Sequence, residues 1–143
     1  MRAIPLLLAL AAFALPAPFA ATAAARPASP QGRWLVEDIR HRGVIDNLQT
    51  TLEIDAAGKV SGLGGCNGYG GAARIKGNRI AFTPMAATRM ACLPAVMDQE
   101  DKFHKALARV VRWRILPTGQ LLLFDRSGRA VLKLARLGAP GSQ

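Results

Sequence analysis

The chain has 143 residues, of which 50% are apolar and 20% charged. This apolar content excludes a disordered chain, and the length fits a single domain of ordinary size. With 19 basic against 9 acidic residues, the net charge of +10 favours contact with anionic surfaces.

The first 25 residues have the three-part pattern of a secretory signal peptide. The positive charge of Arg2 precedes an apolar run from Ala3 through Phe19, and small residues of the A-x-A kind follow. Prolines interrupt the run, whereas a membrane-spanning helix needs about 20 apolar residues. We expect cleavage after Ala23 or Ala25 and no lipid anchor, because no cysteine stands near the cut. The sequence therefore predicts an exported bacterial protein, periplasmic or secreted.

Short extended segments separated by turn signals follow the predicted signal peptide. Residues 26–31, with two prolines and a serine, are expected to form a flexible leader before a domain that spans residues 32–137. The tail, residues 138–143, is expected to be frayed. The first strands are predicted at residues 33–39, 50–54 and 59–63, the last two joined by a turn that ends in Gly58.

A glycine-rich segment comes next, with six glycines between Gly62 and Gly71. A dinucleotide fingerprint would require a helix after the glycines, and a P-loop would require a closing Gly-Lys-Ser/Thr; neither is present. We interpret the glycines as permissive positions that let the backbone bulge and turn sharply around Cys66.

The second half contains the single predicted helix. A hairpin of residues 72–76 and 79–83 precedes it, and residues 85–92 are expected to be irregular or a short helical turn. The helix begins at Pro94, and its apolar stripe has a spacing of three and four residues. The stripe consists of Met97, Phe103, Ala106, Leu107 and Val110, and the hairpin's core candidates are Ile75, Ile80 and Phe82.

Three strands are predicted after the helix, at residues 112–116, 120–124 and 130–137. Trp113 is expected to face the core, with Arg112 and Arg114 facing solvent, because side chains alternate along a strand. Strands that come in hairpins around one helix exclude parallel winding. The predicted fold class is mainly β (α+β): a small curved antiparallel sheet or open barrel of about eight short strands with one packed helix.

The two cysteines, Cys66 and Cys92, are expected to form a disulfide, because an exported protein lives where thiols oxidise. The bridge would be worth roughly 3 to 4 kcal/mol. Two alternatives are weaker: Cys66 as a nucleophile with His104 as its base, and a metal held by both cysteines with His41 and His104. The sequence shows neither an activated thiol nor the ligand spacing of a zinc site. We therefore expect no catalytic residue, no metal and no cofactor.

Polar residues beside the cysteines form a candidate binding or structural motif, which includes Gly65, Asn67, Thr88 and Arg89. Asn67 is expected to hydrogen-bond its own backbone or the segment before Cys92, since Asn tolerates left-handed turns. Arg89 is expected either to clamp an anion or to bridge carbonyl groups of the glycine-rich segment.

The element Gly64-Gly65-Cys66-Asn67, followed at the right interval by Met85 to Cys92, resembles the META domain family, whose bacterial members include HslJ-like proteins. The resemblance covers about residues 32–137. It implies a small curved antiparallel sheet with a packed helix, in a family associated with heat shock, antibiotic tolerance, motility or secretion. It offers no catalytic residue to carry over.

Two classes of function remain. The first is a non-catalytic stress or support module of the cell envelope, which binds a small apolar ligand, a lipid or a partner protein while its basic surface contacts anionic envelope components. The alternative is an enzyme of unknown type that uses the polar cluster around Cys66 and Cys92. Nucleic acid is not an expected partner, because the basic residues are scattered and no recognition motif is present. We expect a monomer.

Overall fold

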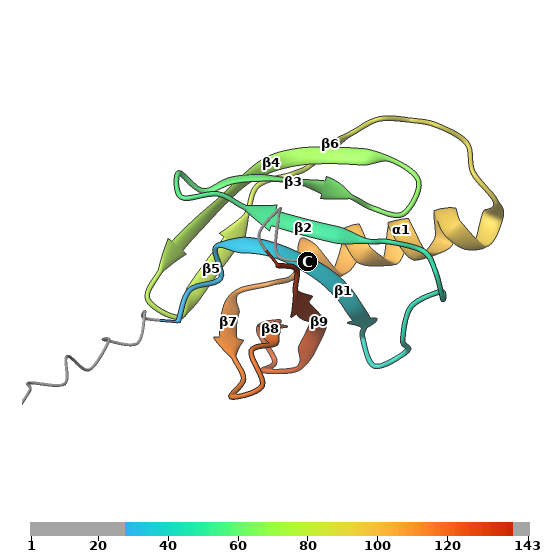
Figure 1. Cartoon of the computed structure of the whole chain (residues 1–143). Helices are drawn as coiled ribbons and strands as arrows, with labels where there is room; N and C mark the ends of the chain where they lie inside the picture. The colour runs from blue at the N-terminus through green and yellow to red at the C-terminus, as the bar shows by residue number, and fades with distance from the viewer. Residues whose placement is uncertain (1–27, 139–143) are drawn as a thin grey trace, which may run out of the picture.

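The computed structural model describes residues 28–138, drawn in colour in Figure 1. The predicted signal peptide and nearly all of the predicted frayed tail lie outside these residues. The elements are β1 (Gly32–Ile39), β2 (Thr51–Ile54), β3 (Lys59–Leu63), β4 (Gly68–Lys76), β5 (Arg79–Phe82), β6 (Ala86–Ala87), α1 (Pro94–Leu107), β7 (Arg112–Ile115), β8 (Leu121–Phe124) and β9 (Ala130–Arg136).

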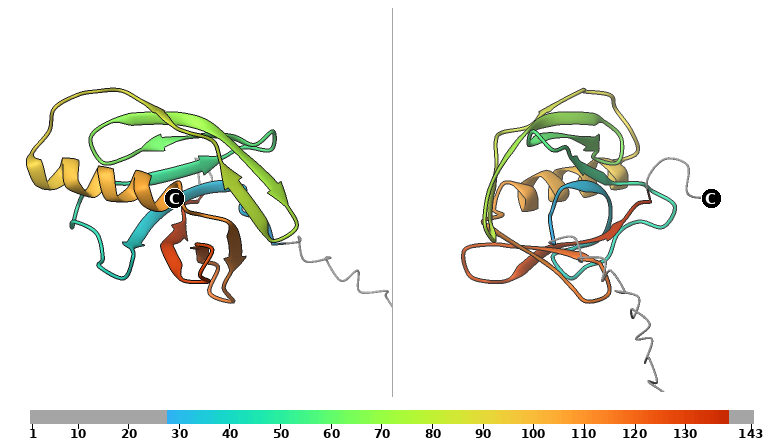
Figure 2. Two further views of the ribbon diagram at one scale, coloured as in Figure 1. Left: turned by 180° about the vertical axis from the view of Figure 1, so that it is seen from behind. Right: turned by 60° about the vertical axis from the view of Figure 1, so that its left-hand side comes forward.

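Eight of the strands form a closed antiparallel barrel. Their order is β3-β2-β1-β9-β8-β7-β5-β4, and pairing of β3 with β4 closes the ring. The two-residue strand β6 lies against β4. Figure 2 shows the strands curving around the molecule, with α1 alongside them. The predicted mainly β class with about eight strands and one helix is confirmed, and the sheet closes on itself.

The hairpin of β2 and β3 shows how local sequence sets the turns. One carboxylate oxygen of Asp55 accepts hydrogen bonds from the N–H groups of Ala57 and Lys59, at 2.9 and 2.8 Å. Gly58 then adopts a φ of +85°, which glycine reaches without steric cost. Ile54 pairs with Val60 across this turn, and both side chains point into the core.

Strand β4 corrects the interpretation of the glycine-rich segment. We expected the bulge and turn to last until Ala72, but the turn ends at Asn67 and β4 begins at Gly68. Residues 68–72 pair with β3, and residues 69–70 also pair with β6. Close approach explains the glycine at residue 71, because a Cβ there would lie 3.0 Å from the Thr83 hydroxyl and closer still to Met85. Dense pairing on both edges therefore overrides the low strand propensity of glycine.

Helix α1 begins at Pro94, as predicted. Of the expected apolar stripe, Met97 is half-buried and the other members are buried. The stripe packs against β1 and β9, and two exposed i,i+4 ion pairs, Asp98 with Lys102 and Asp101 with Lys105, lie on α1 outside the stripe. No helix within residues 28–138 is long and apolar enough to cross a membrane.

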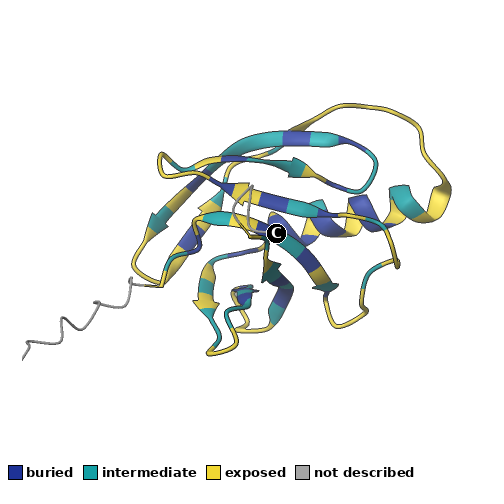
Figure 3. Cartoon of the chain, in the orientation of Figure 1, coloured by how far each residue is buried: buried dark blue, intermediate teal, exposed yellow. Residues whose placement is uncertain are grey.

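Apolar side chains fill the inside of the barrel. Trp34 is fully buried on β1, and its indole N–H donates to the carbonyl of Pro30 at 2.8 Å. Ile80 is buried, Ile75 and Phe82 are half-buried against the core, and so is Trp113, between the exposed Arg112 and Arg114. Further side chains with at most 1% exposure come from β2, β3, β8, β9 and α1 (Figure 3): Leu52, Ile54, Val60, Phe103, Leu107, Leu121, Leu123, Leu132 and Leu134.

Candidate functional site

A disulfide joins the turn after β3 to the segment ahead of α1. Cys66 and Cys92 are 26 residues apart in sequence, and their Cα atoms are 6.1 Å apart, inside the usual range for a bridge. The predicted pairing is present. Neither sulfur is therefore available as a nucleophile or a metal ligand while the bridge is intact.

Asn67 is the centre of the polar cluster beside the disulfide, with 2% of its surface exposed. Its amide nitrogen donates to the Met90 carbonyl at 3.3 Å and to a Glu100 carboxylate oxygen at 2.7 Å. Its amide oxygen accepts from the Thr88 hydroxyl at 3.0 Å and from the Met90 N–H at 2.6 Å. All four hydrogen-bonding positions of the side chain are thus occupied. Asn67 fixes the segment before Cys92, one of the two roles expected from the sequence.

Glu100, a buried residue of α1, holds the turn from the other side. One carboxylate oxygen accepts the N–H groups of Cys66 and Asn67, at 2.9 and 2.7 Å. Burial raises the pKa of Glu100, but the hydrogen bonds from Asn67 and Cys66 outweigh it and bring the pKa below its ordinary value. The turn requires a glycine at position 64, because a Cβ there would lie 2.7 Å from the Cγ of Glu100.

Glu100 was not among the residues expected from the sequence, although its spacing carries a signal. Glu100 precedes Phe103 by three residues and Leu107 by seven, so it lies on the buried stripe of α1. Its neighbour Gln99 is also buried and accepts the Ile45 N–H at 2.6 Å. Polar residues that fall on an apolar stripe indicate a buried hydrogen-bonding role.

The structure brings together only part of the predicted polar motif. Thr88 bonds to Asn67, and Gly65 lies in the turn with a φ of +136°. Arg89 is exposed, and within residues 28–138 its side chain forms no hydrogen bond and no ion pair. The expected bridge from Arg89 to carbonyl groups of the glycine-rich segment is therefore absent from this part of the chain.

His104 lies in an aromatic group rather than beside a reactive thiol. Its ring meets the Tyr69 ring edge to face at a centroid distance of 5.0 Å, and it lies 5.3 Å from the Phe103 ring. Burial lowers the pKa of His104, while the charges of Glu100 and Asp101 oppose that shift. Between residues 28 and 138, no group of three or more His, Cys, Asp or Glu side chains could hold a metal ion. Neither His41 nor His104 therefore belongs to such a group.

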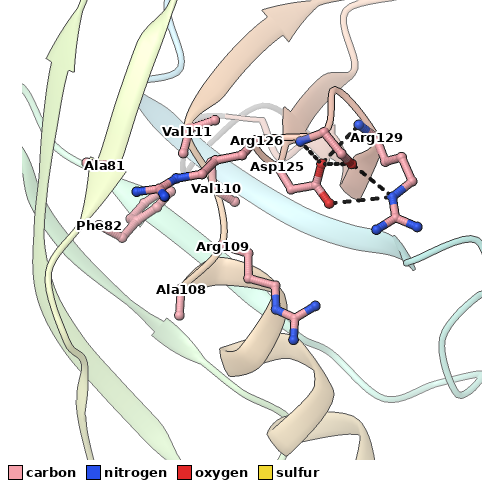
Figure 4. Close-up of a pocket in the computed structure, with 10 residues that line it drawn as sticks. Ala81, Phe82, Ala108, Arg109, Val110, Val111, Asp125, Arg126 and Arg129 are labelled. Atoms are coloured by element: carbon pink, nitrogen blue, oxygen red, sulfur yellow. Dashed lines mark hydrogen bonds and ion pairs between the residues drawn. The ribbon is translucent and has the colours of Figure 1, made fainter.

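Concave surface lies elsewhere, outside the barrel and near the carboxyl end of α1. One cleft of about 320 Å³ has mostly apolar walls, made by Phe82, Pro84, Met85, Ala87, Leu107 and Ala108, with Thr83 and His104. A second cleft, of about 570 Å³, shares Phe82 and Ala108 with it and is rich in arginine (Figure 4). The residue patterns that we singled out in the sequence did not point to either cleft.

Together, the closed barrel, the single helix and the disulfide-tied turn define a small disulfide-bonded β-barrel domain. The sequence profile of the META domain matches residues 28–137, so the chain belongs to the META domain family. The resemblance carried by the glycine–cysteine motif is confirmed. No curated protein matches the chain.

Solved structures share the fold. A protein from Burkholderia xenovorans, solved by NMR, is similar with a TM-score of 0.62 and 23% identity, over 76% of this chain and 83% of that one. A crystal structure of a DUF4847 family protein from Bacteroides vulgatus is similar with a TM-score of 0.58 and 14% identity, over 76% of this chain and 94% of that one. At this identity the likeness describes the fold alone.

Proposed function

We propose that this META domain protein is exported to the bacterial cell envelope and acts there as a non-catalytic binding module of the stress or support kind. Its ligand is a small apolar molecule, a lipid or an apolar segment of a partner protein. The observation that carries the proposal is the apolar cleft between the β5–β6 segment and α1, because it is open while the barrel interior is filled. Its volume of about 320 Å³ lies at the lower end of the range for ligand pockets.

The polar cluster supports a non-catalytic role. Asn67 uses its whole hydrogen-bonding capacity on Thr88, Met90 and Glu100, and both cysteines are joined in the disulfide. A catalytic group needs an unoccupied lone pair or a mobile proton that faces a substrate. Asn67, Thr88 and the two cysteines are thus committed to holding the turn, the loop and the helix together, and Arg89 is the one member of the predicted motif whose side chain forms no such bond within residues 28–138.

Export is supported by the disulfide and by the signal-peptide pattern of residues 1–25. It is tested by expressing the full chain in a bacterium and separating periplasm from cytoplasm. We expect the periplasmic fraction to hold the protein without free thiols under denaturing conditions and without the first 23 or 25 residues. Accumulation of the uncleaved, reduced chain in the cytoplasm would contradict export.

Ligand binding is tested by native mass spectrometry of the protein isolated from the periplasm. We expect a retained small molecule that Ala87→Glu removes, because residue 87 lines the apolar cleft. Ala86→Glu is the matched control, because Ala86 lies next to Ala87 on β6, is also exposed, and is not part of the cleft wall. Binding in this cleft would be contradicted if both variants retained the small molecule. It would also be contradicted if no small molecule were retained by either variant or by the parent protein.

A further inference from the structure

Five arginines surround a depression on the outer face of the barrel where β5 and β7 separate. The two strands pair at a single position, Arg79 with Arg112. The N–H of Ile80 still donates to the Val111 carbonyl at 3.2 Å, but the edge of β5 beyond Ile80 has no partner on β7. The strands therefore leave an opening between Ala81 and the segment that follows α1.

Two neighbouring clefts occupy this opening. The first, of about 570 Å³, has Arg109, Arg126 and Arg129 in its wall, and the second, of about 540 Å³, has Arg79, Arg112 and Arg126. Val111 and Arg126 belong to both walls, so the two clefts are neighbours, and we treat them together as one depression. Figure 4 shows the side chain of Arg126 extending across the first cleft toward Phe82.

Most of this charge is not neutralised within the described part of the chain. Of the five arginines only Arg129 has an acidic partner, Asp125 at 3.6 Å. The side chains of the other four, Arg79, Arg109, Arg112 and Arg126, form no ion pair and no hydrogen bond between residues 28 and 138. Arg79 and Arg112 also face each other directly across the two strands, an arrangement of like charges that destabilises a sheet.

Two features oppose an anion here, and both are weak. The Asp125 carboxylate lies in the wall, but one of its oxygens accepts hydrogen bonds from the Ser127 hydroxyl and from the N–H groups of Ser127 and Arg129. Its negative charge is therefore partly offset by donors of its own turn. The hydrogen bond from the Ser127 hydroxyl is the main reason that the pKa of Asp125 lies below its ordinary value. The carboxyl end of α1 also points toward the cleft, where Arg109 offsets its partial negative charge.

We propose that this depression binds an oligoanion, a molecule with several phosphate or carboxylate groups along its length. Guanidinium groups suit these anions because their fixed fork of donors matches two oxygens at once. The spread of five arginines over two neighbouring clefts favours several anionic groups over one. The inference deepens the proposed binding function and lies at a different surface from the part of the apolar cleft that contains Ala87.

Isothermal titration calorimetry tests the proposal, with protein isolated from the periplasm after expression of the full chain. The probes are tripolyphosphate, trigalacturonate and inorganic phosphate, each in about 150 mM salt so that distant exposed charges are screened. We expect tripolyphosphate or trigalacturonate to bind at least about tenfold more tightly than inorganic phosphate, because each additional anionic group adds a charge-assisted contact. The better of the two probes identifies the anion as phosphate or carboxylate.

The variant for this test is the double substitution Arg112→Gln and Arg126→Gln. Its matched control is Arg40→Gln with Arg42→Gln, which removes the same charge from two exposed residues outside the depression. We expect the first variant to lose about tenfold or more in affinity and the control to keep it. Equal losses in both variants, or no probe that exceeds inorganic phosphate, would overturn the proposal. Neither result would affect the test of the apolar cleft, which uses a retained ligand and Ala87→Glu.

Discussion

Replacing Glu100 with glutamine should destabilise the fold without changing its shape or its disulfide. One oxygen of the carboxylate accepts hydrogen bonds from the backbone N–H groups of Cys66 and Asn67, and the other accepts a hydrogen bond from the Asn67 side-chain NH₂ group. A glutamine that keeps the two backbone bonds must place its NH₂ group against the NH₂ group of Asn67. Asn67 cannot turn its amide over, because its oxygen is already bonded to Thr88 and Met90.

The size of the effect follows from this geometry. Glu100→Gln removes one hydrogen bond to a charged group and sets two donors against each other in a site where Glu100 is only 6% exposed. It also weakens the two remaining bonds, since they no longer reach a full negative charge. Leaving a buried donor without a partner costs about 1 to 3 kcal/mol, so we expect a loss of about 2 to 3 kcal/mol in the free energy of unfolding.

Urea denaturation of the oxidised protein, followed by circular dichroism, measures this loss. Asp101→Asn is the control, because Asp101 is the next residue on α1 and its ion pair with Lys105 is exposed. A pair of that kind contributes at most about 1 kcal/mol. If Glu100→Gln lowered the free energy of unfolding no more than Asp101→Asn does, the assignment of Glu100 as the clamp of the glycine turn would be refuted.

Three further results are expected. Replacing Cys66 and Cys92 together with alanine should cost about 3.5 kcal/mol in urea denaturation, from the entropy of a loop closed over 26 residues; no loss relative to the oxidised parent would contradict this. Burial lowers the pKa of His104 in the folded state below 6.5, the ordinary value for histidine. The stability contributed by the neutral His104 ring is therefore fully present above pH 6.5 and declines as the pH falls below that value. Thermal unfolding between about pH 5 and 7 should show this slope, and His104→Gln should remove it. Asn67→Ala should cost about 2 to 4 kcal/mol, whereas Arg89→Ala should change the free energy of unfolding by less than about 0.5 kcal/mol; a large effect of Arg89→Ala on stability would show that it holds the loop.

Much of the fold follows from local sequence signals. The turn at Gly58, the helix start at Pro94 and the three strands after the helix are all where alternation and turn residues predict them. These signals are local because each depends on a few neighbouring residues. Closure of the barrel was harder to foresee, because β3 and β4 meet through glycines that carry no strand signal of their own.

The site was only partly predictable for the same reason. The cysteine pair and Asn67 stand out in the sequence, but Glu100, which holds their turn, lies 34 residues beyond Cys66. Glu100 is on a helix, and a glutamate on a helix is normally expected to face solvent. The arginine depression combines residues from β5, the segment after α1, β7 and the β8–β9 turn. In sequence these arginines look scattered: the pairing of β5 with β7 sets Arg79 beside Arg112, and the segment after α1 and the β8–β9 turn bring the other three to the same place.

We propose that ligands bind this protein at the outer clefts, while the disulfide cluster holds the fold together. Titration of the ¹⁵N-labelled protein with tripolyphosphate, followed by amide chemical shifts, tests it most directly. We predict that the shifts concentrate in Arg79–Phe82, in Ala108–Arg112 and in the turn from Asp125 to Arg129, and that they saturate. Shifts concentrated instead at Gly64–Asn67 and Thr88–Cys92 would contradict the account and return the binding role to the cysteine cluster.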